Sequence, residues 1–161
     1  MSALGHVLGE LFANAVGNIV GAAAAGSPPV ERVARMARQW GYAVSGRSDQ
    51  SLTLVVTTAR GRRAVTVVLD DTLAAFATFS GFDQPSHRVP GELLPHLLTR
   101  SGKADAGGWF LAEHDNGNAC FGMRYLTPTA GLDAAVLRYV VEGLTGEVDD
   151  FDARLEQARL L

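Results

Sequence analysis

Cysteine is almost absent from this sequence, which holds a single one, Cys120, in 161 residues. One cysteine excludes an internal disulfide framework and a metal site built from several cysteines. A large excess of positive charge is missing too, because the net charge is −3 and the pI is about 5.7, which argues against a dedicated nucleic-acid binder. What is there is globular: 47% of the residues are apolar and 19% are charged. The length suits one domain that buries roughly 70% of its surface around a single core.

Motifs that announce a reaction are also missing. No G-x-G-x-x-G pattern opens a helix after a strand, and no serine lies in a nucleophile-elbow pattern. Ser101-Gly102-Lys103 matches the end of a phosphate loop, but Leu97 stands where the first glycine of that loop belongs. The histidines lack the spacing of a zinc site with a third and fourth ligand; they are His6, His87, His96 and His114. We therefore predict no catalytic residue, no metal and no cofactor.

Two groups could still be interpreted as chemical. A nucleophilic cysteine needs a nearby base or cation to lower its pKa, and His114 and Arg124 are the nearest candidates for Cys120. A buried structural thiol is the favoured interpretation. Asp70-Asp71 could hold a metal, but adjacent acids between two strands are typical of a turn. A small enzyme that uses Cys120 or the histidines remains the less favoured alternative.

Residues 1–29 differ from the rest of the chain, with one charged side chain, Glu10, and many Gly and Ala. We predict a helix with small residues every four positions, followed by a linker that ends in Pro28-Pro29. Its apolar stripe is expected to pack within the chain or in a dimer, through Leu4, Leu8, Leu11, Phe12 and Ile19. Four interior glycines cost about 1 kcal/mol each relative to alanine, so this helix needs a partner surface. A membrane-bound helix over residues 4–25 and an unstructured arm remain open as alternatives.

Residues 30–161 show a regular succession of helix and strand patterns. We predict helices over residues 30–40, 86–102 and 132–155, with Pro95 shortening or kinking the second and Gly143 and Gly146 interrupting the third. Strands are predicted over residues 51–59, 63–69, 73–79, 109–114 and 119–126, joined by hairpins. The fold class is therefore α+β, in the order α-β-β-β-α-β-β-α, with an antiparallel sheet that carries helices on one face and an extra N-terminal Gly/Ala-rich helix.

Charge is unevenly placed along the chain. From Arg32 to Arg63 there are seven arginines and one acid, and from Glu142 to Glu156 there are six acids and one arginine. The segments could form two solvated faces, or they could complement each other in a dimer or attract a charged partner.

Most of the chain, residues 30–155, resembles the YbjN family and the related type III secretion chaperone-like fold. The element order carries the resemblance, together with Gly41-Tyr42 after the first helix, the Trp109–Leu126 hairpin, Gly131-Leu132 and the Val148-Asp149-Asp150-Phe151 segment of the last helix. The resemblance implies binding rather than catalysis, because such chaperones are small cytoplasmic dimers that hold a partly unfolded client, while YbjN-like proteins are often described as regulators. It supplies no catalytic residue.

A client of this kind can add a strand to an open sheet edge and place apolar side chains between helix and sheet. The candidate partner-binding residues lie on the third predicted strand and the next helix: Phe76, Phe79, Phe82, Leu93, Leu94 and Leu97. Taken singly, each of them is also typical of plain core. We predict a cytoplasmic, homodimeric, non-catalytic module that binds a protein or peptide, with no nucleic-acid partner. A membrane-associated interaction protein anchored by residues 4–25 is the alternative.

Overall fold

The computed structural model describes residues 29–160, and the predicted N-terminal helix, with Leu4, Leu8, Leu11, Phe12 and Ile19, lies outside them. The proposed division of the chain at residue 29 therefore stays a prediction. The elements are α2 (Pro29–Gln39), β1 (Ala43–Arg47), β2 (Ser51–Thr58), β3 (Gly61–Leu69), β4 (Leu73–Pro85), the 3₁₀ turn η1 (Ser86–Arg88), α3 (Leu93–Ser101), β5 (Gly108–Glu113), β6 (Asn118–Pro128), the 3₁₀ turn η2 (Thr129–Gly131) and α4 (Ala134–Gln157). The predicted α+β class with an antiparallel sheet is confirmed.

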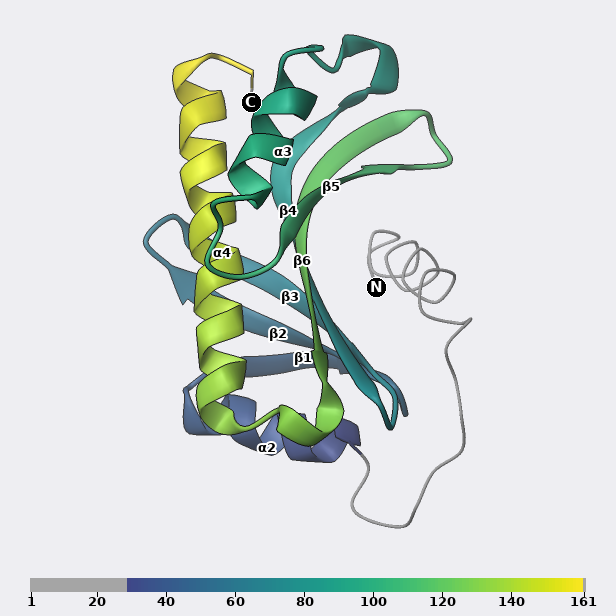
Figure 1. Cartoon of the computed structure of the whole chain (residues 1–161), viewed down its shortest axis with the longest axis vertical. Coiled ribbons are helices and arrows are strands. Elements are labelled where there is room, and N and C mark those ends of the chain that lie inside the picture. The colour runs from purple at the N-terminus through teal and green to yellow at the C-terminus, as the bar shows by residue number, and fades with distance from the viewer. Residues whose placement is uncertain (1–28, 161) are drawn as a thin grey trace.

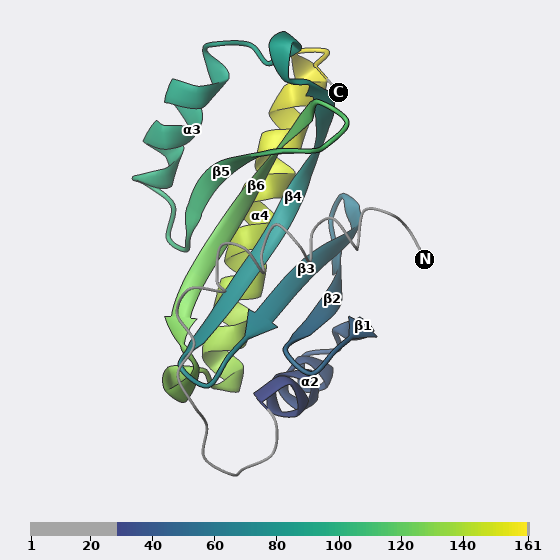
Figure 2. The ribbon, with the colours of Figure 1, turned by 90° about the vertical axis from the view of Figure 1, so that its right-hand side faces the viewer.

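The sheet is built on one long central pair of strands. Its order is β1-β2-β3-β4-β6-β5, and β4 pairs with β6 from Leu73 opposite Pro128 to Pro85 opposite Asn118. β3 pairs only with residues 74–77 of β4, whereas β5 pairs with residues 119–124 of β6. The neighbouring strands therefore join opposite ends of the central pair, which Figure 2 shows with β1–β3 at one end and β5 at the other.

Helix α4 packs along one side of this sheet over its full length (Figure 1). The Asp133 side chain caps its first turn by accepting a hydrogen bond from the Val136 amide at 2.8 Å. The apolar residues at three- and four-residue spacing that predict this helix form a stripe along it, and five of them are buried: Val140, Leu144, Val148, Phe151 and Leu155. The glycines do not interrupt α4. At Gly143 a Cβ would lie 3.2 Å from the Cβ of Ala106, so this glycine allows the loop before β5 to approach the helix closely.

Two sequence predictions need correction. The sheet has six strands rather than five, because Ala43–Arg47 forms an edge strand whose mostly exposed residues carry no alternating apolar signal. The helix expected over residues 86–102 begins only at Leu93, because β4 continues to Pro85 and a 3₁₀ turn follows. Pro95 falls in the first turn of α3, where a backbone N–H has no partner within the helix, so it removes no helical hydrogen bond.

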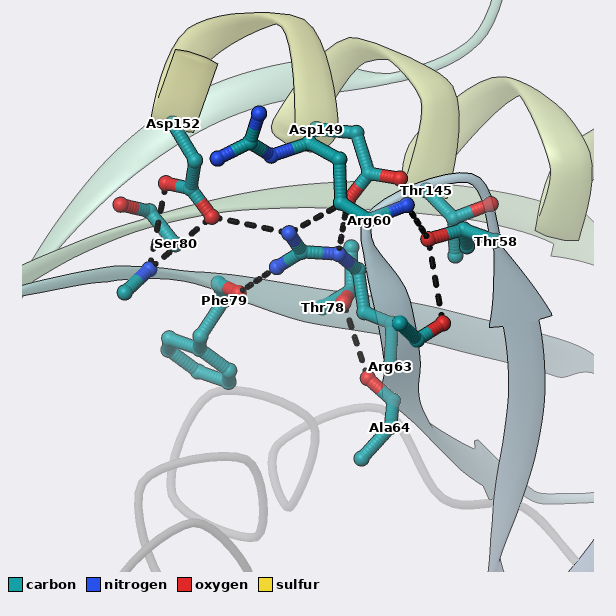
Figure 3. Close-up of polar contacts among 12 residues, drawn as sticks. Thr58, Arg60, Arg63, Ala64, Thr78, Phe79, Ser80, Thr145, Asp149 and Asp152 are labelled. Atoms are coloured by element: carbon teal, nitrogen blue, oxygen red, sulfur yellow. Dashed lines mark hydrogen bonds and ion pairs between the residues drawn. The ribbon is translucent and has the colours of Figure 1, made fainter. Parts of the chain in front are cut away.

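A bulge in β4 is filled by a charged cluster. Between the pairs Phe79–Gly122 and Asp83–Cys120, β4 has three residues and β6 has one. Arg63 of β3 donates to the Phe79 carbonyl at 2.7 Å, from Nε to Asp149 at 2.7 Å and from Nη2 to Asp152 at 2.8 Å (Figure 3). Asp152 in turn accepts from the Gly81 amide at 3.1 Å. The cluster therefore supplies the hydrogen-bond partners of bulged backbone groups and ties β3, β4 and α4 together.

The uneven charge of the sequence is explained by contacts within one chain. The acids that pair with Arg63 both lie on α4, and the neighbouring Arg60 pairs with Glu156 of the same helix. The arginine-rich and acidic segments thus complement each other in part intramolecularly, and for these residues no dimer or charged partner is required.

Arg63 is predicted to be critical for stability. The side chains of Arg63, Asp149 and Asp152 are 15%, 12% and 7% exposed. We expect Arg63→Ala to lower the free energy of unfolding by about 3 kcal/mol, because two nearly buried carboxylates lose their cation and Phe79 loses a donor. Urea unfolding measures the change. Arg60→Ala, which removes a surface ion pair from the same hairpin, is the matched control and should shift the midpoint only slightly. Equal losses for the two variants would contradict the assignment.

Candidate partner-binding surface

The two faces of the sheet are covered differently. Residues of α2, α3 and α4 all join the main core on one face, which we call the inner face. On the opposite face, the open face, no helix of the described residues is packed, and Figure 2 looks onto it with α4 behind the strands. The apolar centre of the open face consists of Val68 on β3, Ala75, Ala77 and Phe79 on β4, and Phe110 on β5.

An aromatic pair spans three strands on the open face. The rings of Phe79 and Phe110 meet edge to face, with centroids 5.4 Å apart and an interplanar angle of 82°. The Phe110 ring lies over Gly122 of β6, where an added Cβ would come within 2.7 Å of the ring, so the contact requires glycine. The guanidinium of Arg124 lies 5.9 Å from the Phe110 centroid. This end of the open face is therefore held by contacts between β4, β5 and β6.

Small side chains form the middle of the open face and larger ones its margin. Ala75 and Ala77 are 2% and 0% exposed. Leu126 of β6 lies directly opposite Ala75 of β4. It is 54% exposed, although it lies in the interior of a strand. Since its neighbour Tyr125 packs on the inner core, strand alternation places Leu126 on the open face.

The structure does not bring the six predicted partner-binding residues into one surface. Phe76, Phe82 and Leu97 are buried in the inner core, against which Leu93 packs half-buried. Phe79 lies on the open face, so the sheet separates it from the α3 leucines, and Leu94 is 42% exposed on α3. Phe76 and Phe79 are three residues apart in one strand, and an odd spacing puts side chains on opposite faces. The predicted groove is therefore filled by core at three of its positions.

Four surface residues were missed by the sequence analysis: Val68, Phe110, Leu126 and Leu98 of α3, which is 71% exposed. For the first three a signal existed. If strand alternation puts Phe121, Met123 and Tyr125 in the core, it puts the even-numbered residues of β6, such as Leu126, on the other face. Residues that pair across the sheet share a face, so Phe110 and Val68 follow from the same pattern. For Leu98 no signal existed, because a helix with four leucines does not reveal which of them remains exposed.

The candidate chemical groups are placed in structural roles. Asp70 occupies the β3–β4 turn and accepts hydrogen bonds from the Thr72 and Leu73 amides at 2.6 and 2.7 Å. Burial raises the pKa of the Asp70 carboxyl. The two amide hydrogen bonds and a third from the Thr72 hydroxyl together lower it by more, so the pKa lies below its usual value. Within residues 29–160 no three His, Cys, Asp or Glu side chains gather as metal ligands. No helix in that range is long and apolar enough to cross a membrane.

Cys120 is buried in β6, opposite Asp83 of β4. Burial, and then the negative charge of Asp83, raise the pKa of the thiol to about 11. A thiol in this state is a poor nucleophile at neutral pH, which agrees with the favoured structural interpretation.

We predict that Cys120 reacts with a disulfide reagent such as dithiobis-nitrobenzoate at least tenfold more slowly in the native chain than in urea-unfolded chain at pH 8. The native rate should keep rising with pH toward about 11 instead of levelling near 9. Asp83→Asn should lower the apparent pKa, since it removes the neighbouring charge. A native rate that levels near pH 9, or one equal to that of the unfolded chain, would contradict this placement.

No protein-family model matches the sequence, and no curated protein matches it either. Solved structures do match. YbjN from E. coli aligns with a TM-score of 0.59 and 13% identity over 80% of this chain and 92% of that one. A chain of the HopA1–SchA chaperone–effector complex aligns with a TM-score of 0.54 and 12% identity, over 76% of this chain and 91% of that one.

A chain of the ExoU–SpcU type III secretion complex of Pseudomonas aeruginosa aligns with 20% identity over 79% of this chain and 95% of that one, at a TM-score of 0.47. At identities this low, the two alignments with TM-scores above 0.5 show a shared fold alone. The chain thus has the fold of YbjN and of a chain in the HopA1–SchA complex, which confirms the resemblance predicted from the sequence.

Proposed function

We propose that this chain is a non-catalytic, chaperone-like module that holds an extended or amphipathic segment of a partner protein on the open face of its sheet. The observation that carries the proposal is the apolar open face, which no helix among residues 29–160 covers. A homodimer in the cytoplasm, without a cofactor, is part of the same proposal.

The chemistry of the open face favours an apolar segment of a protein. Fully burying a leucine or phenylalanine side chain is worth about 1.5–3 kcal/mol, and Leu126 offers most of that gain because over half of its surface is exposed. Val68, Phe79 and Phe110 are half-buried around the small centre and add to the area that a partner can cover. The strand register also places two polar residues, Thr66 and Arg124, on this face, on either side of Ala77. A helix or strand with both apolar and polar side chains can contact such a surface.

Two further observations support the proposal. A chain of similar fold occurs in a structure described as a chaperone–effector complex, which supports a protein as the ligand. Four groups of the kinds used in catalysis have structural roles: Asp70 in a turn, Asp149 and Asp152 with Arg63, and Cys120 in a buried strand. The membrane-associated alternative depends on residues 4–25, which lie outside the described residues, and it stays a prediction.

A second exposed apolar surface lies on α3. Leu94 and Leu98 are four residues apart on one side of this helix and are 42% and 71% exposed. This pair was partly predicted, through Leu94, and it is an independent candidate for partner contact. The test must therefore separate the two surfaces.

We expect Leu126→Glu to lower the amount of a specific partner captured from a lysate of the native cells at least tenfold, because a charge on the open face must be desolvated on binding. Leu98→Glu, the same change at a more exposed leucine on α3, is the matched control and should leave capture within twofold of the original chain. Quantitative mass spectrometry of proteins retained by the three immobilised chains measures both effects.

The opposite pattern would contradict the proposal. A partner lost with Leu98→Glu but retained with Leu126→Glu would assign binding to α3. If no retained protein depended on either leucine, the chain would not be a partner-binding module of this kind. Matched far-ultraviolet circular dichroism of the three chains establishes that each is folded.

A further inference from the structure

We propose that residues 4–20 of this same chain form an amphipathic helix that lies across the open face and covers it until a partner displaces it. The displacement by a partner rests on the proposed function, whereas the docking of the segment does not. Three features support this docking: the residue pattern of the segment, the place where the described chain begins, and the shape of the open face.

The segment has the composition of a helix that needs a surface. Its large apolar residues recur on one stripe, at Leu4, Leu8, Leu11, Phe12, Val16 and Ile19. Polar residues follow a separate edge at four-residue spacing: His6, Glu10, Asn14 and Asn18. Such a helix can bury one side and keep the other in water. Its several glycines make it unstable in isolation, so a covering surface is required for it to form.

The described chain begins near one end of the sheet. Arg32, in the first turn of α2, donates to the Thr129 carbonyl at 2.9 Å, and the Thr129 amide donates to the Thr72 carbonyl at 2.9 Å. Pro29 therefore lies near the end of the central pair where Leu73 is opposite Pro128. Residues 21–28 can span about 27 Å when extended, which is enough to carry the chain around this end of the sheet. A connection this short favours the same chain over a second copy as the source of the segment.

The dimensions and shape of the open face suit the segment. A helix of 17 residues is about 25 Å long, and the 13 residues of β4 extend over about 40 Å, so the helix fits along the central pair. Small residues in the middle of the face, Ala75 and Ala77, leave room for leucine or phenylalanine side chains of a helix. Leu126 and Phe79 stand at the margin to pack beside them. The apolar centre of the open face matches the apolar stripe of the segment.

Photo-crosslinking on the full chain tests the docking directly. A p-benzoylphenylalanine in place of Leu126 should crosslink to residues 4–20 on irradiation, and peptide mass spectrometry locates the bond. The same group in place of Leu98 is the matched control, because Leu98 is even more exposed but belongs to α3; it should give no crosslink to residues 4–20. Mixing chains of natural and nitrogen-15 composition separates crosslinks within one chain from those between copies.

Three outcomes would overturn the proposal. The first is no crosslink from position 126 to residues 4–20, and the second is equal crosslinking from position 98. The third is crosslinks that join only a nitrogen-15 chain to a chain of natural composition. The last result would assign the open face to the segment of a second chain. Both positions are exposed in the structure, so neither replacement disturbs the core.

A second pair of variants tests the apolar stripe. Leu8→Glu with Phe12→Glu should reduce the crosslink from position 126 at least tenfold. Asn14→Glu with Asn18→Glu adds the same charge on the polar edge and should leave it within twofold. Equal reduction by both pairs would overturn the assignment of the stripe.

The two proposals fail separately. If the crosslink forms but no captured protein depends on Leu126, the segment covers the open face and the proposed function is wrong. If a partner depends on Leu126 but the crosslink does not form, the open face binds a partner and the segment does not cover it. If both hold, the Leu8→Glu and Phe12→Glu chain should capture several-fold more partner than the original chain.

Discussion

Helix α4 covers one face of the sheet and leaves the other uncovered. A buried contact between Arg63 and two acids of α4, Asp149 and Asp152, holds the helix on that face. Burying three charged groups is costly unless their hydrogen bonds are made, and here the Phe79 carbonyl and the Gly81 amide in the bulge of β4 complete them. The same side chains thus neutralise one another and satisfy backbone groups that the bulge removes from the ladder. Because α4 is held in this way against β3 and β4, one face of the sheet is covered by helix along its whole length.

The face that α4 leaves uncovered is the one on which a function can be argued. On β4 the large side chains Phe76 and Phe82 point to the inner core, while Ala75 and Ala77 occupy the middle of the open face. Stability alone does not require apolar side chains on that face, since antiparallel sheets often carry polar residues on the side turned to water. The presence of apolar side chains there, with an exposed Leu126 inside a strand, favours an apolar partner surface.

The sequence predicts the parts of this fold that depend on neighbours along the chain. The stripe of α4 and the hairpin of β5 and β6 follow from periodicity and from Asn116-Gly117, and both are confirmed. β1 was missed because five largely exposed residues leave no periodic signal. Arg63 and Asp149 are 86 positions apart, so no local pattern could pair them. The six predicted partner-binding residues do not share one surface for another reason: they were grouped by proximity in sequence, although strand alternation already separates Phe76 from Phe79.

The glycines of residues 4–20 give the proposed cover a specific physical character. Gly5, Gly9 and Gly17 each cost about 1 kcal/mol relative to alanine in a helix, so together they weaken a docked segment by about 3 kcal/mol, or more than a hundredfold in its equilibrium constant. Tethering offsets part of this loss, because a linked segment binds at a high effective concentration. A partner with a similar apolar stripe but better helix-forming residues regains the lost free energy and can compete although it is not tethered. A weak segment held close to its site thus protects an apolar face from unspecific contact while leaving it open to a stronger ligand.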